Sequence, residues 1–160
     1  MKKRTFGSAI LLLVSTALRA GDFPSVPYPE GYRDWHHVKS MEIQEGHPLS
    51  GAFGGIHHIY ANKKALQGYR AAKFPDGSVI AFDLLAAEKA DNTMTEGTRK
   101  VLGVMHKDSK KYSATGGWGF EGFAGGDKTK RVVGKDAATA CFSCHEPQKD
   151  HDYVFSKLRN

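Results

Sequence analysis

Hydrophobic and polar positions alternate in a pattern that predicts strands through the middle of the chain. Four segments have a strand pattern: 52–61, 78–86, 99–107 and 116–125. In the last, aromatic residues and glycines alternate at period two, which places Trp118 and Phe120 on one face. Gly54 and Gly55 either weaken the first strand or mark a close approach. These strands predict an antiparallel sheet as the centre of the fold.

Three further segments have helical patterns: 32–41, 62–72 and 151–160. Asn62 is positioned as the N-cap of the second helix, and Phe74–Gly77 has the Pro-Asp-Gly composition of a turn. In the closing helix, Val154 and Leu158 should face inward. The pattern therefore predicts an α+β fold, a mainly antiparallel β-sheet with short flanking helices.

The first 20 residues have a basic start, an apolar run through Val14 and small residues before Gly21. This is the pattern of a secretory signal peptide, and its apolar run is too short to span a bilayer permanently. We expect cleavage after Ala20, or else after Ala17. Residues 1–20 are thus a signal peptide and 21–160 a single domain, exported to the periplasm without stable membrane insertion.

Removal of that segment changes the charge of the protein. The full chain has 23 basic and 17 acidic residues, a net charge of +6, and residues 1–20 hold four of the basic residues and no acid. The mature domain therefore carries 19 − 17 = +2. So small a charge does not indicate a nucleic-acid partner.

The two cysteines of the chain lie together in the sequence "CFSCH", residues 141–145. A close cysteine pair serves a redox disulfide, a zinc site, or thioether attachment of haem, which uses C-x-x-C-H. A structural zinc site usually needs a second ligand pair, and a thioredoxin-like dithiol usually follows a βαβ pattern. The motif therefore favours one covalently attached haem c, with zinc and a redox dithiol as the alternatives.

Helical geometry supports the haem interpretation. Residues three and four apart lie on one face of a helix, so Cys141, Cys144 and His145 can all point at one flat ligand. The two cysteines would form the thioethers and His145 would be the axial ligand of the haem iron. Asp136 is a candidate N-cap, and Pro147 should end the helix just past the histidine.

Six motifs occur in a characteristic order: "YRDW", "IYAN", "FPDGSVI", "KDSKKY", "GGWGFEGF" and the C-terminal C-x-x-C-H. With these motifs the chain resembles the cytochrome P-460 family, and within it the cytochrome c′-β branch, from about Tyr28 to the C-terminus. The resemblance implies a mainly β domain with one c-type haem, usually a homodimer. It also implies a site for an exogenous ligand on the haem face opposite the histidine.

The resemblance also separates two functional kinds. The enzymatic kind has a lysine cross-linked to the porphyrin and a polar distal pocket, and it oxidises hydroxylamine and nitric oxide. In this sequence Phe82 occupies the lysine position, His57 the position of an arginine, and about Gly103 that of an acid. The c′-β kind has phenylalanines over the iron, where Phe53 and Phe82 stand. In a regular strand over 52–61, Phe53 and His57 would share a face.

These observations predict a gas-binding c-type cytochrome whose ligands are nitric oxide and carbon monoxide, bound in a distal pocket of Phe53, Phe82 and His57. An apolar pocket suits these gases because they need no hydrogen bond to bind ferrous iron. One alternative is a hydroxylamine-oxidising enzyme with His57 as an acid–base group. Another is a plain electron carrier with Met105 or Met41 as sixth ligand. The sequence does not identify the redox partner.

Overall fold

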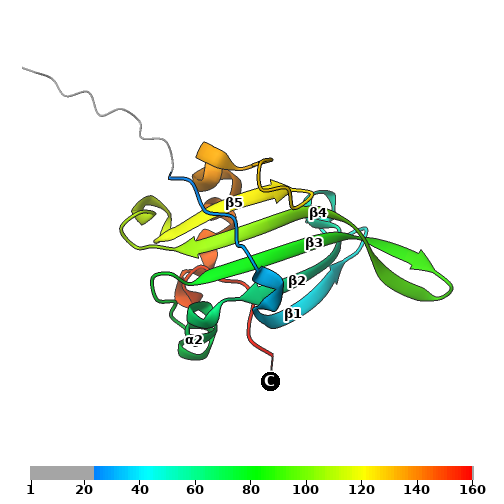
Figure 1. Cartoon of the computed structure of the whole chain (residues 1–160), viewed down its shortest axis with the longest axis horizontal. Coiled ribbons are helices and arrows are strands. Elements are labelled where there is room, and N and C mark those ends of the chain that lie inside the picture. Colours follow the sequence, from blue (N-terminus) through cyan, green and yellow to red (C-terminus); the bar gives the residue numbers. More distant parts are fainter. Residues whose placement is uncertain (1–23, 160) are drawn as a thin grey trace, which may run out of the picture.

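The centre of the fold is a five-stranded antiparallel sheet in which every strand pairs with its neighbour in sequence, in the order β1-β2-β3-β4-β5. The computed structural model describes residues 24–159 (Figure 1). The strands are β1 (His36–Ile43), β2 (Gly55–Ala61), β3 (Val79–Ala90), β4 (Thr93–Lys107) and β5 (Trp118–Ala124). The predicted antiparallel sheet is therefore confirmed.

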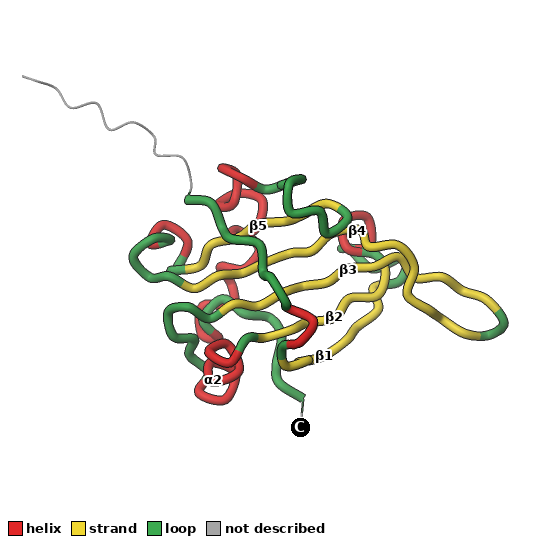
Figure 2. Tube along the Cα trace, in the orientation of Figure 1, coloured by secondary structure: helices red, strands yellow, loops and turns green. Residues whose placement is uncertain are grey.

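Short helices surround this sheet, mostly at its margins and behind it in the view of Figure 2. They are η1 (Tyr32–Asp34), α1 (Ser50–Phe53), α2 (Lys63–Ala71), η2 (Ser113–Thr115), η3 (Gly134–Asp136), η4 (Ala138–Phe142), α3 (Ser143–His145) and η5 (Glu146–His151). The architecture is the predicted α+β class. Among the described residues, no helix has the length and apolarity needed to cross a membrane.

The two faces of the sheet carry separate hydrophobic clusters. One face, called here the motif face, packs against the segment that holds the cysteines. Its side chains include Ile59, Ile80, Phe82, Met105, Trp118 and Phe120. The opposite face, called the far face, includes Ala81, Leu102, Val104 and Phe123. The alternation follows from the period of two along each strand.

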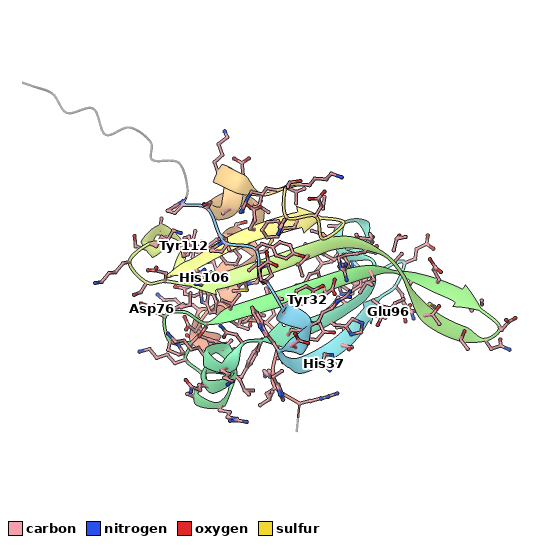
Figure 3. The ribbon with its side chains drawn as sticks, in the orientation of Figure 1. Tyr32, His37, Asp76, Glu96, His106 and Tyr112 are labelled. Carbon is pink, nitrogen blue, oxygen red and sulfur yellow. The ribbon has the colours of Figure 1, made fainter. Side chains whose placement is uncertain are left out.

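The N-terminal segment crosses the far face and covers it, as Figure 1 shows. Val26 and Tyr32 are buried there, and the Tyr32 hydroxyl donates to the buried carboxylate of Asp83 at 2.7 Å. Arg99 donates to both oxygens of Asp83, so the buried charge is paired as such groups require. In Figure 3 the labelled Tyr32, the first residue of η1, lies on this near side of the sheet.

The outer parts of β3 and β4 form a two-stranded hairpin that protrudes well beyond the other strands (Figure 1). From Glu88 to Glu96 its residues are exposed. The labelled Glu96 in Figure 3 lies near the base of this hairpin, where its carboxylate is 2.6 Å from Nε2 of His58. That contact ties the hairpin to β2 on the far face.

Several predicted elements occur as expected. Helix α2 begins after Asn62, whose side chain accepts from the Ala65 backbone N–H at 2.8 Å and so caps the helix. The Phe74–Gly77 turn follows it, with Ser78 N–H bonded to the Pro75 carbonyl oxygen at 3.0 Å. Strand β3 then begins at Val79. In β5, Trp118 and Phe120 share the motif face, as the alternation predicts.

Two predicted boundaries in the first half of the chain are wrong. Only Tyr32–Asp34 of the segment 32–41 is helical, as a short 3-10 turn, and β1 follows from His36. Strand β2 begins at Gly55 rather than at residue 52, because Phe53 lies at the end of α1. Gly55 has φ +128°, and a Cβ there would collide with the Leu85 carbonyl oxygen. The predicted close backbone approach is confirmed at this glycine.

The predicted closing helix over 151–160 is also wrong. Helix η5 ends at His151, and the two following residues, Asp152 and Tyr153, have φ +52° and +65°. A left-handed backbone cannot continue a right-handed helix, so the chain runs on without helix or strand. Val154 is nevertheless buried, and Leu158 packs against the same cluster. The predicted signal peptide, residues 1–20, lies outside the described residues.

Candidate functional site

The segment with both cysteines is a run of short helical turns, η4, α3 and η5, packed against the motif face. The predicted cap at Asp136 is wrong: that residue lies in η3, and the residue before η4 is Ala137. The predicted end of the helix just past His145 is wrong: Glu146 keeps a right-handed helical backbone, and η5 continues the helical turns through Pro147 to His151, because proline is tolerated in a first turn.

His145 is held in one orientation by the chain that follows it. Its Nδ1 lies 2.8 Å from the carbonyl oxygen of Tyr153. A carbonyl oxygen only accepts, so Nδ1 carries the proton and Nε2 keeps its lone pair, which is the form of a metal-ligating histidine. The ring also lies 5.0 Å from those of Phe120 and Phe155, centroid to centroid. Burial lowers the pKa of His145 and so favours the neutral, ligating form.

The two cysteines are both free thiols in this fold. Cys141 is half-buried and packs against the motif-face cluster, whereas Cys144 is exposed. Burial raises the pKa of the Cys141 thiol to about 11, with the carboxylate of Glu121 adding to the effect. Both cysteines lie within four residues of His145, and the raised pKa keeps the Cys141 thiol protonated at neutral pH.

Phe53, Phe82 and His57 come together from three different elements. The Phe53 ring meets the Phe82 ring edge-on, with centroids 5.8 Å apart. The His57 ring lies 4.6 Å from the Phe82 ring at an interplanar angle of 33°. His57 and Phe82 share the motif face through the pairing of β2 and β3, but Phe53 arrives from α1. The expected strand parity of Phe53 and His57 is thus wrong, although the two residues reach the same place.

His57 faces the motif side, and its neighbour His58 faces the opposite side. His58 bonds to Ser40 and Glu96 on the far face, while His57 is 4% exposed and its Nδ1 has no hydrogen-bond partner among the described residues. Burial lowers the pKa of His57 to about 4, and the nearby His58 and Lys39 act in the same direction. His57 is therefore a neutral polar ring in an apolar setting at pH 7.

A row of glycines lies beside Phe82 on the motif face. Phe82 pairs with Gly103 on β4, which in turn pairs with Gly122 on β5. Since paired residues share a face, the sheet surface carries no side chain at these two positions. Large apolar side chains around this face stay exposed, including Val132 at 60% and Phe155 at 56%. The space over Gly122 is filled by Val132 and Val133 and that over Gly103 borders Phe82, so this part of the motif face is apolar.

Both methionines of the electron-carrier alternative lie on the same face. Met105 packs against the motif-face cluster, and Met41 pairs with His57 across β1 and β2. The electron-carrier alternative, in which a methionine is the sixth iron ligand, therefore has both candidate side chains on the motif face.

Sequence reasoning missed the groups that hold His145. The Tyr153 carbonyl accepts from its ring, and Asp152 anchors that turn through Lys107, Phe74 and Trp118. The sequence pattern over 151–160 indicated a helix, in which these contacts would not form. An Asp followed by an aromatic residue carries no recognised signal for two successive left-handed residues.

Together, the fixed tautomer of His145, the adjacent thiols and the apolar motif face fit a haem. The family model described as Cytochrome P460 matches residues 29–156. The chain belongs to the cytochrome P460 family, and a haem cofactor follows from that membership. No curated protein matches the chain.

Proposed function

We propose that the protein is an exported c-type cytochrome with one covalent haem that binds nitric oxide or carbon monoxide. Cys141 and Cys144 would hold the haem through thioethers, and Nε2 of His145 would ligate its iron. The observation that supports this donor set is the bond from His145 Nδ1–H to the Tyr153 carbonyl oxygen, which leaves Nε2 free. Bound haem would supply an iron centre with one coordination position open to a diatomic gas.

The observation that favours gas binding over oxidation chemistry is the setting of Phe82. Its ring contacts both Phe53 and His57, at the position where the resemblance implies a cross-linking lysine in enzymatic members. A phenyl ring has no nucleophilic atom to bond to a porphyrin. Phe53 and Phe82 would form an apolar distal wall, crowding any ligand and offering it no hydrogen bond.

His57 gives less support to the enzymatic alternative than the sequence suggested. An acid–base group works best with a pKa near the working pH, whereas burial holds the pKa of His57 at about 4. At neutral pH its ring would stay uncharged. Its role would be to present one neutral polar edge within the apolar distal wall.

Absorption spectra of the purified holoprotein test the proposal. The oxidised, reduced and gas-treated forms should show a haem whose ferrous state changes on addition of carbon monoxide or nitric oxide. The reduced protein should be five-coordinate before gas is added. Turnover of hydroxylamine with an electron acceptor at about 1 s⁻¹ or more, an ordinary enzymatic rate, would instead favour the enzymatic alternative.

We also propose a periplasmic location and a homodimer. The location rests on the basic and apolar pattern of residues 1–20, and the homodimer on the family resemblance. Cell fractionation and light scattering of the holoprotein test these two statements separately from gas binding.

A further inference from the structure

Two successive residues after η5 adopt a left-handed backbone without being glycine. Asp152 has φ +52° and ψ +41°, and Tyr153 has φ +65°. Residues other than glycine are disfavoured in the left-handed region, although Asp tolerates it better than most. Such a conformation persists when the surroundings hold it in place. The turn is also the one whose carbonyl group accepts from His145.

Asp152 is held by groups from three distant parts of the chain. Its Oδ2 accepts from the Phe74 backbone N–H at 2.9 Å, and its Oδ1 accepts from Nζ of Lys107 at 2.6 Å. Its own carbonyl oxygen accepts from the indole Nε1–H of Trp118 at 2.8 Å. Every side-chain and carbonyl acceptor of Asp152 thus has a donor that belongs to the body of the domain.

Lys107 is the charged partner in this set. It is the last residue of β4 and pairs with Trp118 across β4 and β5. Its Nζ also donates to the Gly116 carbonyl oxygen at 3.1 Å and lies 5.1 Å from the centre of the Trp118 ring. The side chains of Lys107 and Asp152 are only 10% and 15% exposed. Solvent therefore screens this ion pair far less than an exposed one.

The contacts form a continuous chain from the sheet to the histidine. Lys107 fixes Asp152, Asp152 fixes the left-handed turn, and the turn directs the Tyr153 carbonyl oxygen at His145 Nδ1. A hydrogen bond to the second nitrogen of a ligating histidine sets its tautomer and raises its basicity as a ligand. Breaking the Lys107–Asp152 pair would leave a poorly solvated charge and loosen the turn.

We propose that the buried Lys107–Asp152 ion pair is the positioning device for the axial ligand, tuning the bond between His145 and the haem iron through the Tyr153 carbonyl group. This inference rests on the proposed function, since it takes His145 as the iron ligand. Lys107 and Asp152 are positioning residues that touch neither the haem nor its gas ligand in this role.

Three variants separate the charge from the backbone conformation. Asp152→Asn keeps a residue that tolerates the left-handed region, but an amide offers one acceptor oxygen where the carboxylate serves two donors. Lys107→Met keeps an apolar stem against Trp118 and removes the charge. The double variant Lys107→Met/Asp152→Asn removes both charges and carries the test if Lys107→Met does not fold. Lys128→Met breaks an exposed ion pair with Glu30 and is the matched control.

The readouts are the iron–histidine stretching band of the ferrous holoprotein, by resonance Raman spectroscopy, and its reduction potential. We expect the band to move to lower frequency and the potential to rise in the three test variants, because a less basic histidine donates less charge to the iron. The control should keep the wild-type band and potential. Covalent haem content is measured on every protein first.

The outcomes distinguish the two proposals. Test variants with full haem content and wild-type bands and potentials would overturn the positioning role and leave the proposed function intact. Wild-type protein without covalent haem would overturn the proposed function and this inference together. A shift in the test variants that the control does not share supports the inference, since a merely structural ion pair would alter stability alone.

Discussion

The imidazole of His57 lies 4.6 Å from the phenyl ring of Phe82, although the two residues are not direct partners in the sheet. His57 pairs with Leu84, and Phe82 pairs with Ile59. The contact is therefore a diagonal one across two neighbouring strands, which long aromatic side chains can span. It brings the polar ring of His57 against Phe82, the residue on which the resemblance to the gas-binding kind rests.

The first prediction concerns the covalent attachment of haem. Mass spectrometry of the periplasmic protein should find the mature chain plus one haem, which stays attached in acid-acetone. Cys141→Ser/Cys144→Ser should lose that attachment, because serine cannot form the thioethers, whereas Ser143→Ala should keep it. A zinc-loaded protein, or an internal disulfide in place of haem, would contradict the prediction.

A second prediction concerns the coordination of ferrous iron. Without added gas it should be five-coordinate, because the phenyl rings of Phe53 and Phe82, which supply no ligand atom, are proposed to form the distal wall. Resonance Raman spectra of wild type, Met105→Leu and Met41→Leu should therefore be alike. A six-coordinate low-spin wild type that changes in one methionine variant would reveal the electron carrier instead.

The third prediction concerns the two phenylalanines. Phe82→Ala and Phe53→Ala should each speed carbon monoxide association by about tenfold, the effect of removing roughly 1.4 kcal/mol from the barrier. The physical reason is that a packed ring must move before a ligand can enter. Stopped-flow or flash-photolysis kinetics provide the measurement.

Met94→Ala is the control for this kinetic prediction, because Met94 is an exposed apolar residue on the outer hairpin of β3 and β4. It should leave gas association near the wild-type rate. Phe82→Ala should also lower the free energy of unfolding, by less than the roughly 3 kcal/mol lost with a fully buried phenylalanine, because Phe82 is only partly buried. If both Phe82→Ala and Phe53→Ala bind gas at the wild-type rate, the two rings do not obstruct ligand entry.

The fourth prediction uses the pKa of His57. It is about 4 in the folded protein, against an ordinary value of 6.5. Between these two pH values the unfolded chain binds a proton that the folded protein does not. Stability should therefore fall as the pH drops through this window, by up to about 3 kcal/mol from this residue. Above pH 6.5 the residue should have no such effect.

His57→Phe tests this pH dependence. The variant should lose up to about 1.4 kcal/mol per pH unit from the slope of unfolding free energy between pH 6.5 and 4. His47→Phe, which changes an exposed histidine, should leave the slope as it is. Denaturant unfolding at a series of pH values measures both. An unchanged slope in His57→Phe would mean that the ring is charged in the folded state.

The sequence predicts those parts of the fold that depend on local chemistry. The Asn62 cap, the Phe74–Gly77 turn and the alternation around Trp118 each follow from a few neighbouring residues. All three occur in the structure. In these places local preference and tertiary packing agree.

Elements whose conformation depends on distant groups could not be predicted in this way. Phe53 reaches Phe82 from a helix because the backbone at Gly55 passes close to Leu85, a residue thirty positions away. The turn at Asp152 is held by donors on Phe74, Lys107 and Trp118. These contacts cannot be read from a single sequence, and local composition alone favours the helix predicted over 151–160.

The neighbour-to-neighbour order of the five strands has a consequence for how the chain assembles. Each strand between residues 36 and 124 pairs with the next strand along the chain, so the sheet can form through contacts of short sequence separation, which tend to fold fast. The cysteine segment follows the last strand, and its turn binds residues as far back as Phe74. Its docking onto Phe74 therefore closes a loop of 78 residues. We expect refolding in two steps: the sheet forms first, and the C-terminal segment with the two cysteines docks onto it later. Haem attachment would then take place on a sheet that has already formed.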